Sequence, residues 1–143
     1  MKQTKTNSIS KGIKIFFTFF IFSLACQQSF GQMLNGIIFQ PMRILGESST
    51  HVDVSGAIVK CDSSNQIHLK VFNESNISQV AVFELTVTNT TDGTHFSKSV
   101  SIPMMVPLQH IEGNCSGDSQ LADLIINLPA TYNPSNTTMN VNF

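Results

Sequence analysis

Apolar and polar residues alternate along residues 66–102, and this alternation constrains the fold of the chain more than any other feature. Successive side chains of a strand point to opposite faces, so a period of two predicts strands with one buried and one wet face. We expect strands at 66–72, 80–88 and 95–102, the last two joined by a turn at 90–93 that contains an Asp-Gly pair. The residues expected on the buried face are Ile67, Leu69, Val71, Phe83, Leu85, Val87, Phe96, Val100 and Ile102.

His68 and Lys98 are the two side chains of this block whose surroundings the alternation describes least simply. His68 alternates with the apolar set of its strand, so we assign it, with Lys70, to the wet face. Lys98 is the one residue that does not fit, because it occupies a buried-face position between Phe96 and Val100.

More short strands are expected on both sides of this block. An edge strand at 37–40 would end at Pro41, because proline removes a donor from the ladder. In the strand expected at 51–61 the apolar set changes phase after Gly56, which predicts a bulge or a bend between sheets. Residues 137–143 alternate again and predict a final strand.

The segment between these strands is less regular. Pro103 and Pro107 predict an irregular crossing at 104–106. Residues 121–128 fit either a strand or two helical turns, and Pro129 ends either one. The whole pattern predicts an all-β chain, with a single two-layer antiparallel β-sandwich over 51–143 and a lead-in segment at 32–50.

The first 31 residues have the order of a secretory signal peptide. Four lysines lie before or at the start of an apolar run at 13–25, and the small residues Ser29 and Gly31 follow it. This run is shorter than the roughly 20 residues that span a bilayer. We therefore expect an N-terminal signal helix, cleavage after Gly31, and a mature exported chain without a membrane span.

Cysteine usage agrees with export. Cys61 and Cys115 remain after that cleavage. A pair in a small exported domain is most simply a disulfide, and two buried free thiols are the alternative. Cys26 ends Phe22-Ser23-Leu24-Ala25-Cys26, which resembles a bacterial lipobox. That resemblance implies cleavage before Cys26 and a lipid anchor on it, whereas cleavage after Gly31 implies a soluble secreted or periplasmic protein.

Removal of the leader makes the chain acidic. Four of the eight Lys and Arg remain, against nine Asp and Glu, so the net charge becomes four minus nine, or −5. Binding to nucleic acid depends on neutralising phosphates with a basic cluster, so we expect none. With no Trp and one Tyr available for stacking on sugar rings, carbohydrate binding is disfavoured as well.

The candidate catalytic and metal-binding residues are few. The segment Cys115-Ser116-Gly117-Asp118-Ser119 resembles the Gly-Asp-Ser sequence around the nucleophile of trypsin-like proteases, which implies Ser119 as a nucleophile. Those enzymes also have Gly-Gly after the serine, and Gln120 and Leu121 follow here. His51 and Asp53 could supply half of a metal site, because residues two apart on a strand share a face. Two ligands do not define a site, and we expect no catalytic residues, no metal and no cofactor.

In strand number, size and single disulfide, the domain resembles the immunoglobulin-like and fibronectin type III-like sandwiches of bacterial exported proteins. Residues 128–132 are similar to the Leu-x-Pro-x-Thr-x-Tyr stretch of type III domains, whose tryptophan is absent here. Residues 52–61 resemble the first strand of chaperone–usher pilus subunits, which runs through a Gly to a Cys. Residues 138–143 resemble their C-terminal strand, which implies strand donation between subunits.

These observations predict a non-enzymatic exported β-sandwich that acts through contact with a protein partner at the cell envelope or outside the cell. An uncovered sheet edge would be the means of contact, since it can add a strand from a partner. A strand-complemented fibre subunit is one alternative. A small serine hydrolase that uses Ser119 is the other.

Overall fold

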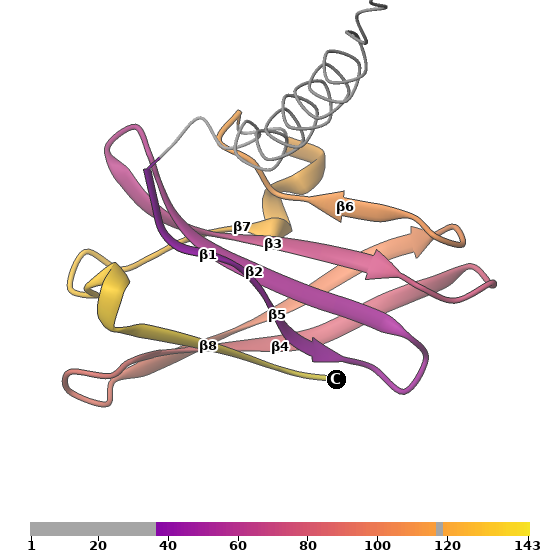
Figure 1. Ribbon diagram of the computed structural model, residues 1–143, viewed down its shortest axis with the longest axis horizontal. Coiled ribbons are helices and arrows are strands. Elements are labelled where there is room, and N and C mark those ends of the chain that lie inside the picture. The colour runs from indigo at the N-terminus through magenta and orange to yellow at the C-terminus, as the bar shows by residue number, and fades with distance from the viewer. Residues whose placement is uncertain (1–36, 117–118) are drawn as a thin grey trace, which may run out of the picture. The chain divides into compact units, whose positions relative to one another are not determined.

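The computed structural model describes residues 37–116 and 119–143, and for 119–121 it describes the backbone alone. Within these residues eight strands form two antiparallel sheets that pack into a two-layer β-sandwich (Figure 1). The all-β sandwich predicted from the alternation is therefore confirmed. The expected signal helix and Cys26 lie outside the described residues.

The first sheet contains the N-terminal strands. Strands β1 (Ile37–Glu47), β2 (Val52–Cys61) and β3 (Ser64–Asn73) follow one another as antiparallel neighbours. The other edge of β3 pairs with two short strands, β6 (His110–Glu112) and β7 (Ile125–Asn127). The segment expected as a lead-in thus contains β1, an edge strand that continues through Pro41.

The second sheet has three strands. Strand β4 (Gln79–Asn89) lies between β5 (His95–Met105) and β8 (Thr137–Asn142). The turn between β4 and β5 requires a left-handed residue, and Gly93 supplies it with φ of 76°. The predicted hairpin and the predicted final strand are both confirmed.

The inward faces of the two sheets form one hydrophobic core. The predicted buried face of β3, β4 and β5 is confirmed, with Phe96 at its margin. The core also takes in Val52, Val54, Ile58, Ala81, Met105, Leu124, Ile126, Leu128, Tyr132 and Met139. Since burial of one such side chain contributes about 1.5–3 kcal/mol, this core is the main source of stability of the domain.

The prediction that β2 has a bulge, or bends from one sheet to the other, at Gly56 is wrong. Strand β2 pairs with β3 in one unbroken register from Val52 to Cys61, and the irregularities lie in the ladder between β1 and β2. The apolar set of β2 changes because the outer face becomes covered, so that Ala57, Val59 and Cys61 are buried there. On that face these three residues pack against Met42 and Cys115 in a second, smaller cluster, which excludes solvent.

The prediction of an irregular crossing at 104–106 is also wrong for residues 104 and 105, which belong to β5. Strand β5 continues through Pro103 to Met105. Proline is tolerated because β5 lies at the edge of its sheet, where a missing backbone donor breaks no bond to a second neighbour. Residues 121–128 combine both alternatives, since a 3₁₀ helix, η2 (Ser119–Leu124), leads into β7.

The edge position of β5 also explains Lys98. This residue pairs with Leu85 in the ladder and is half-buried. Its Nζ lies 3.6 Å from Asp123 Oδ1 in η2. At an edge strand the long side chain can leave the core and keep its charge in water, so the lysine covers apolar surface without being buried as an ion.

Strands β1 and β8 close one side of the sandwich. A Cβ atom on Gly46 would lie 2.7 Å from Val141 Cγ2, so the absence of a side chain allows β1 to approach β8. Gln40 Nε2 also donates to the carbonyl oxygens of Pro134 and Thr137, each at 2.7 Å. In residues 37–116 and 119–143 there is no helix long and apolar enough to cross a membrane.

Candidate functional site

The opposite side of the sandwich is open as far as the structure describes the chain. Among the described residues β5 has a strand partner, β4, on one side only. Between β5 and β6 there is a groove of about 380 Å³, lined by Ile102, Met104, Met105, Ile111, Asp123 and Leu124. The groove exposes the margin of the core beside an unpaired strand edge, which is the arrangement that can accept an extended segment.

The turn after β5 carries an exposed apolar side chain on a strained backbone. Gln109 N donates to Val106 O at 3.2 Å across Pro107 and Leu108, and Leu108 has φ of 59°. Proline followed by a positive φ defines a type II turn, in which the third position ordinarily holds Gly or Asn. Leu108 occupies that position and is 68% exposed, so neither packing nor backbone preference accounts for it.

A buried asparagine ties this turn to the neighbouring loop between β3 and β4. Asn73 is fully buried, and its Nδ2 donates to the carbonyl oxygens of Ile77, Met105 and Val106 at 2.9, 3.3 and 3.1 Å. Its Oδ1 accepts from the backbone N–H of Ser75 at 3.1 Å, among other donors.

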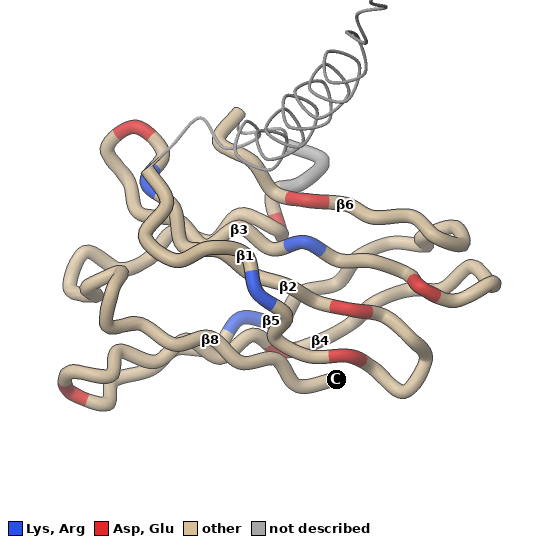
Figure 2. The backbone as a smooth tube through the Cα atoms, viewed as in Figure 1, with Lys and Arg blue, Asp and Glu red and all other residues tan. Residues whose placement is uncertain are grey.

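These bonds fix two loops that expose apolar side chains at the same end of the sandwich. Ile77, Val106 and Leu108 are all more than half exposed. The turn 106–109 contains no charged residue, as Figure 2 shows. We call Ile77, Met104, Val106 and Leu108 the apolar tip.

Replacing Leu108 by Asn should increase the stability of the domain. Asn adopts positive φ readily, whereas a leucine held there costs about 1–2 kcal/mol. We expect Leu108→Asn to raise the free energy of unfolding by about 1 kcal/mol in urea titrations. Leu108→Ala is the matched control, because it removes the same apolar contact but keeps the strain. Equal effects of the two substitutions would contradict this explanation.

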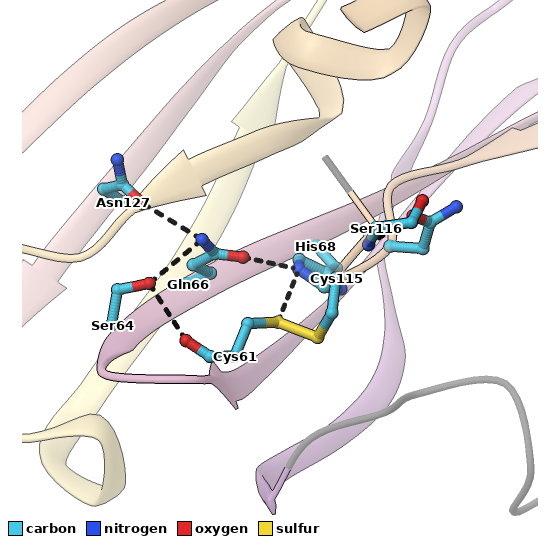
Figure 3. The surroundings of a disulfide bond; sticks show 8 residues. Cys61, Ser64, Gln66, His68, Cys115, Ser116 and Asn127 are labelled. Carbon is cyan, nitrogen blue, oxygen red and sulfur yellow. Dashed lines mark hydrogen bonds between the residues drawn. A yellow bond between two sulfur atoms is a disulfide. The ribbon is translucent and has the colours of Figure 1, made fainter. Parts of the chain in front are cut away.

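A second candidate site lies on the outer face of the first sheet. Cys61 at the end of β2 and Cys115 in the loop after β6 form a disulfide, with Cα atoms 5.5 Å apart (Figure 3). In antibody domains the conserved disulfide joins the two sheets. Here the bond instead fastens the loop after β6 over Ala57 and Val59.

His68 lies beside this disulfide and is fully buried, so its assignment to the wet face is wrong. The loop that carries Cys115 covers the outer face at this point and excludes solvent from the ring. His68 Nε2 lies 3.5 Å from Cys61 Sγ and 3.0 Å from Gln66 Oε1 (Figure 3). Nδ1 has no hydrogen-bond partner among the described residues.

The surrounding network determines which nitrogen carries the proton. Ser64 Oγ donates to Cys61 O at 3.2 Å, so it accepts from Gln66 Nε2 at 3.1 Å. Gln66 Oε1 is then the acceptor that faces His68, and it requires a donor on Nε2. The network therefore places a ring proton of His68 on Nε2, and in the neutral imidazole Nδ1 has an unused lone pair.

Burial of His68 predicts a pH-dependent stability. Desolvation lowers the pKa of His68 below its ordinary value of 6.5. Between the two values the unfolded chain binds more protons than the folded domain, so stability rises with pH. We expect the free energy of unfolding to fall as pH drops below 6.5.

Urea titrations from about pH 7.5 to 5 would measure this effect. His68→Gln keeps a donor near the position of Nε2 and cannot titrate, so it should flatten this part of the pH profile. The matched control is His95→Gln, which makes the same substitution at an exposed histidine. A profile unchanged by His68→Gln would contradict the assignment.

The proposed His51 and Asp53 pair does not form as expected. His51 precedes β2, with φ of 62°, and its Nδ1 contacts Glu47 Oε1 at 3.0 Å. Since His51 belongs to the turn, the two-residue rule for strands does not apply to it. Asp53 instead lies near Glu47 and Glu74, and its negative charge raises the pKa of Glu74.

Ser119 begins η2, but its side chain lies outside the described part of the chain. The hypothesis of a serine nucleophile therefore stays a prediction. Comparisons with protein-family models, with curated proteins and with solved structures found no match to this chain.

Sequence reasoning identified the cysteines but missed the other residues of both sites. Alternation assigned His68 to solvent, because a period of two cannot indicate a loop that folds over the outer face. Pro107 was a signal for a turn, but proline occurs at this position of both type I and type II turns, and a bulky third residue gives no sign of the positive φ of Leu108. Nothing local distinguishes Asn73 from an ordinary turn asparagine, since its partners are distant along the chain.

Proposed function

We propose that the chain is an exported, non-enzymatic β-sandwich that binds a protein partner by adding an extended segment of that partner along the open edge of β5. The location is the cell envelope or the medium, with a lipid anchor on Cys26 as the alternative to a soluble form. The single observation that carries the proposal is the apolar groove between β5 and β6 beside an unpaired strand edge.

The asymmetry of the sandwich supports this choice of edge. On the side formed by β1 and β8, the hydrogen bonds of Gln40 and the close approach of the two strands at Gly46 leave no space between the sheets at these positions. On the β5 side, η2 covers one part through Leu124 and Asp123, and the groove remains beside Ile102 and Met105. The partner segment would place alternate apolar side chains in this groove and bond its backbone to β5.

The apolar tip supports the same conclusion independently. Met104 and Leu108 are 69% and 68% exposed, and Leu108 occupies a position where Asn would relieve strain. Stability is commonly given up in this way where a side chain serves binding. Because Asn73 holds the tip in place, little conformational entropy is lost when a partner covers it.

A photo-crosslinking experiment in the cells that produce the protein tests this function. A photoreactive residue would replace Leu108 or Ser101, which are both exposed at the proposed site. Control positions are Ile44 on β1, which is 72% exposed, and Thr138 on the outer face of β8. We expect one common adduct from the first two positions and its absence from both controls.

Leu108→Asp in the Ser101 crosslinking variant should abolish that adduct, because it places a charge in the apolar contact without straining the turn. Ile44→Asp is the matched substitution on the closed side and should leave the adduct intact. The proposal would be wrong if adducts form equally at all four positions, or if Ser101 gives none in a folded protein.

The fibre alternative has less support. Residues 138–143, which resemble a donated strand, belong to or adjoin β8, and β8 pairs with β4 of the same chain. Donation of this strand would require it to leave its own sheet. A partner other than a second copy is therefore favoured. Analytical ultracentrifugation tests this alternative. If the sedimentation coefficient rises with protein concentration, and Leu108→Asp prevents this rise, the open edge would instead serve self-assembly.

A further inference from the structure

The disulfide and the buried histidine bring together three metal-binding side chains that the proposed function does not use. One ligand atom each from Cys61, His68 and Cys115 lies within 4.8 Å of the others. Cys61 and His68 are buried, and Cys115 is half-buried, so the group lies under the surface with access from the side of Cys115.

We propose that reduction of the disulfide converts this cluster into a zinc site. A dithiol reductant transfers two electrons and two protons to the Cys61–Cys115 bond and becomes a disulfide itself. Zn²⁺ then binds both sulfur atoms and one nitrogen of His68, and the two thiols release two protons. Two thiolates and one neutral imidazole are a preferred ligand set of zinc and leave the site without net charge.

The geometry around Cys61 already suits a tetrahedral ion. Zn–S bonds of about 2.3 Å and Zn–N bonds of about 2.0 Å place a sulfur and a nitrogen ligand about 3.5 Å apart. The distance from Cys61 Sγ to His68 Nε2 is 3.5 Å. Once the bond is broken the sulfurs must separate to about 3.8 Å, which rotation of the cysteine side chains can supply.

Zinc on Nε2 moves the ring proton of His68 to Nδ1, which gives up no hydrogen bond there. Nδ1 has no acceptor among the described residues, so its N–H would donate to a water molecule. The bond given up is the one from Nε2 to Gln66 Oε1. That oxygen lies 3.0 Å from Nε2, and either it or a water can occupy the fourth position.

Zinc would thereby replace the disulfide as the link between the end of β2 and the loop after β6. The oxidised domain has no free thiolates and should not bind zinc at this position. The site is independent of the open edge of β5, because the disulfide lies on the outer face of the first sheet.

The test uses the purified mature chain, reduced with a water-soluble phosphine that is then removed without oxygen. Native mass spectrometry after addition of Zn²⁺ should find one ion on each reduced chain and none on the oxidised chain. Cd²⁺ in place of Zn²⁺ should produce the charge-transfer absorption of metal–thiolate bonds. Zinc should also raise the unfolding temperature of the reduced chain.

His68→Gln should weaken zinc binding to the reduced chain at least about tenfold, since loss even of a residue that only supports a ligand costs that much. His95→Gln is the matched control and should bind as the parent does. The proposal is overturned if the folded reduced chain binds no zinc, or if His68→Gln binds equally well. It is also overturned if the reduced chain unfolds and zinc does not restore the fold.

Discussion

Replacement of Asn73 by Ala should lower the free energy of unfolding by about 3 kcal/mol. The side chain is fully buried and serves three backbone carbonyls through Nδ2, while its Oδ1 accepts from Ser75 and from Gln79 Nε2. Each hydrogen bond contributes about 1 kcal/mol net, and each buried group left without a partner costs about 1–3 kcal/mol. The loss stays below the sum of these terms because the Nδ2 group has only two hydrogens for the three carbonyls.

Urea titration of the purified domain would measure this loss. Asn140→Ala, at an exposed position of β8, is the matched control and should change stability by less than about 0.5 kcal/mol. Asn73→Asp has the same shape but no donor and buries a charge, so it should destabilise more than Ala. A loss below about 1 kcal/mol for Asn73→Ala would show that the two loops are held by other contacts.

The same substitution connects stability with the proposed function. Asn73 joins the loop that carries Ile77 to the turn that carries Leu108. Without it, hydrogen exchange at Val106 and Gln109 should become faster relative to the core of β4. Crosslinking through Leu108 should weaken at a temperature where the domain is still folded, because the apolar tip is no longer held for binding.

The strands could be predicted because their determinants are local. Ile67, Leu69 and Val71 alternate with polar residues, and burial on one face follows from that period. What the pattern could not indicate is which outer surface is also covered. His68 and Cys61 lie on the outer face of the first sheet, where the loop with Cys115 covers them, and this loop belongs to a segment more than 40 residues further along.

The sequence could indicate that an open sheet edge would be present, but it could not indicate which strand forms that edge. Both the order of strands in a sheet and the closing of one side by β1 and β8 depend on pairings between distant segments. The irregular crossing was predicted from Pro103 for the same reason. Proline excludes a central strand but is compatible with the edge position that β5 occupies. The misfit of Lys98 was in fact a sign of that edge.

Reduction of the Cys61–Cys115 bond, in buffer freed of metal ions by a chelator, should destabilise the domain by about 4 kcal/mol. The two cysteines are 54 residues apart in sequence, so the bond removes much of the freedom of the unfolded chain. Reduction also releases the loop that covers Ala57 and Val59, whose burial then contributes less. Urea titration with and without the phosphine reductant measures the difference.

The double variant Cys61→Ala with Cys115→Ala provides the matched control, because it has the lower stability but nothing to reduce. Its unfolding transition should be the same with and without reductant. If reductant leaves the parent unchanged as well, the two cysteines are free thiols and the disulfide is excluded. The parent should lose stability on reduction and regain part of it when Zn²⁺ is added, whereas the double variant should respond to neither the reductant nor Zn²⁺. That result would show that the same two cysteines form both the disulfide and the zinc-bound link.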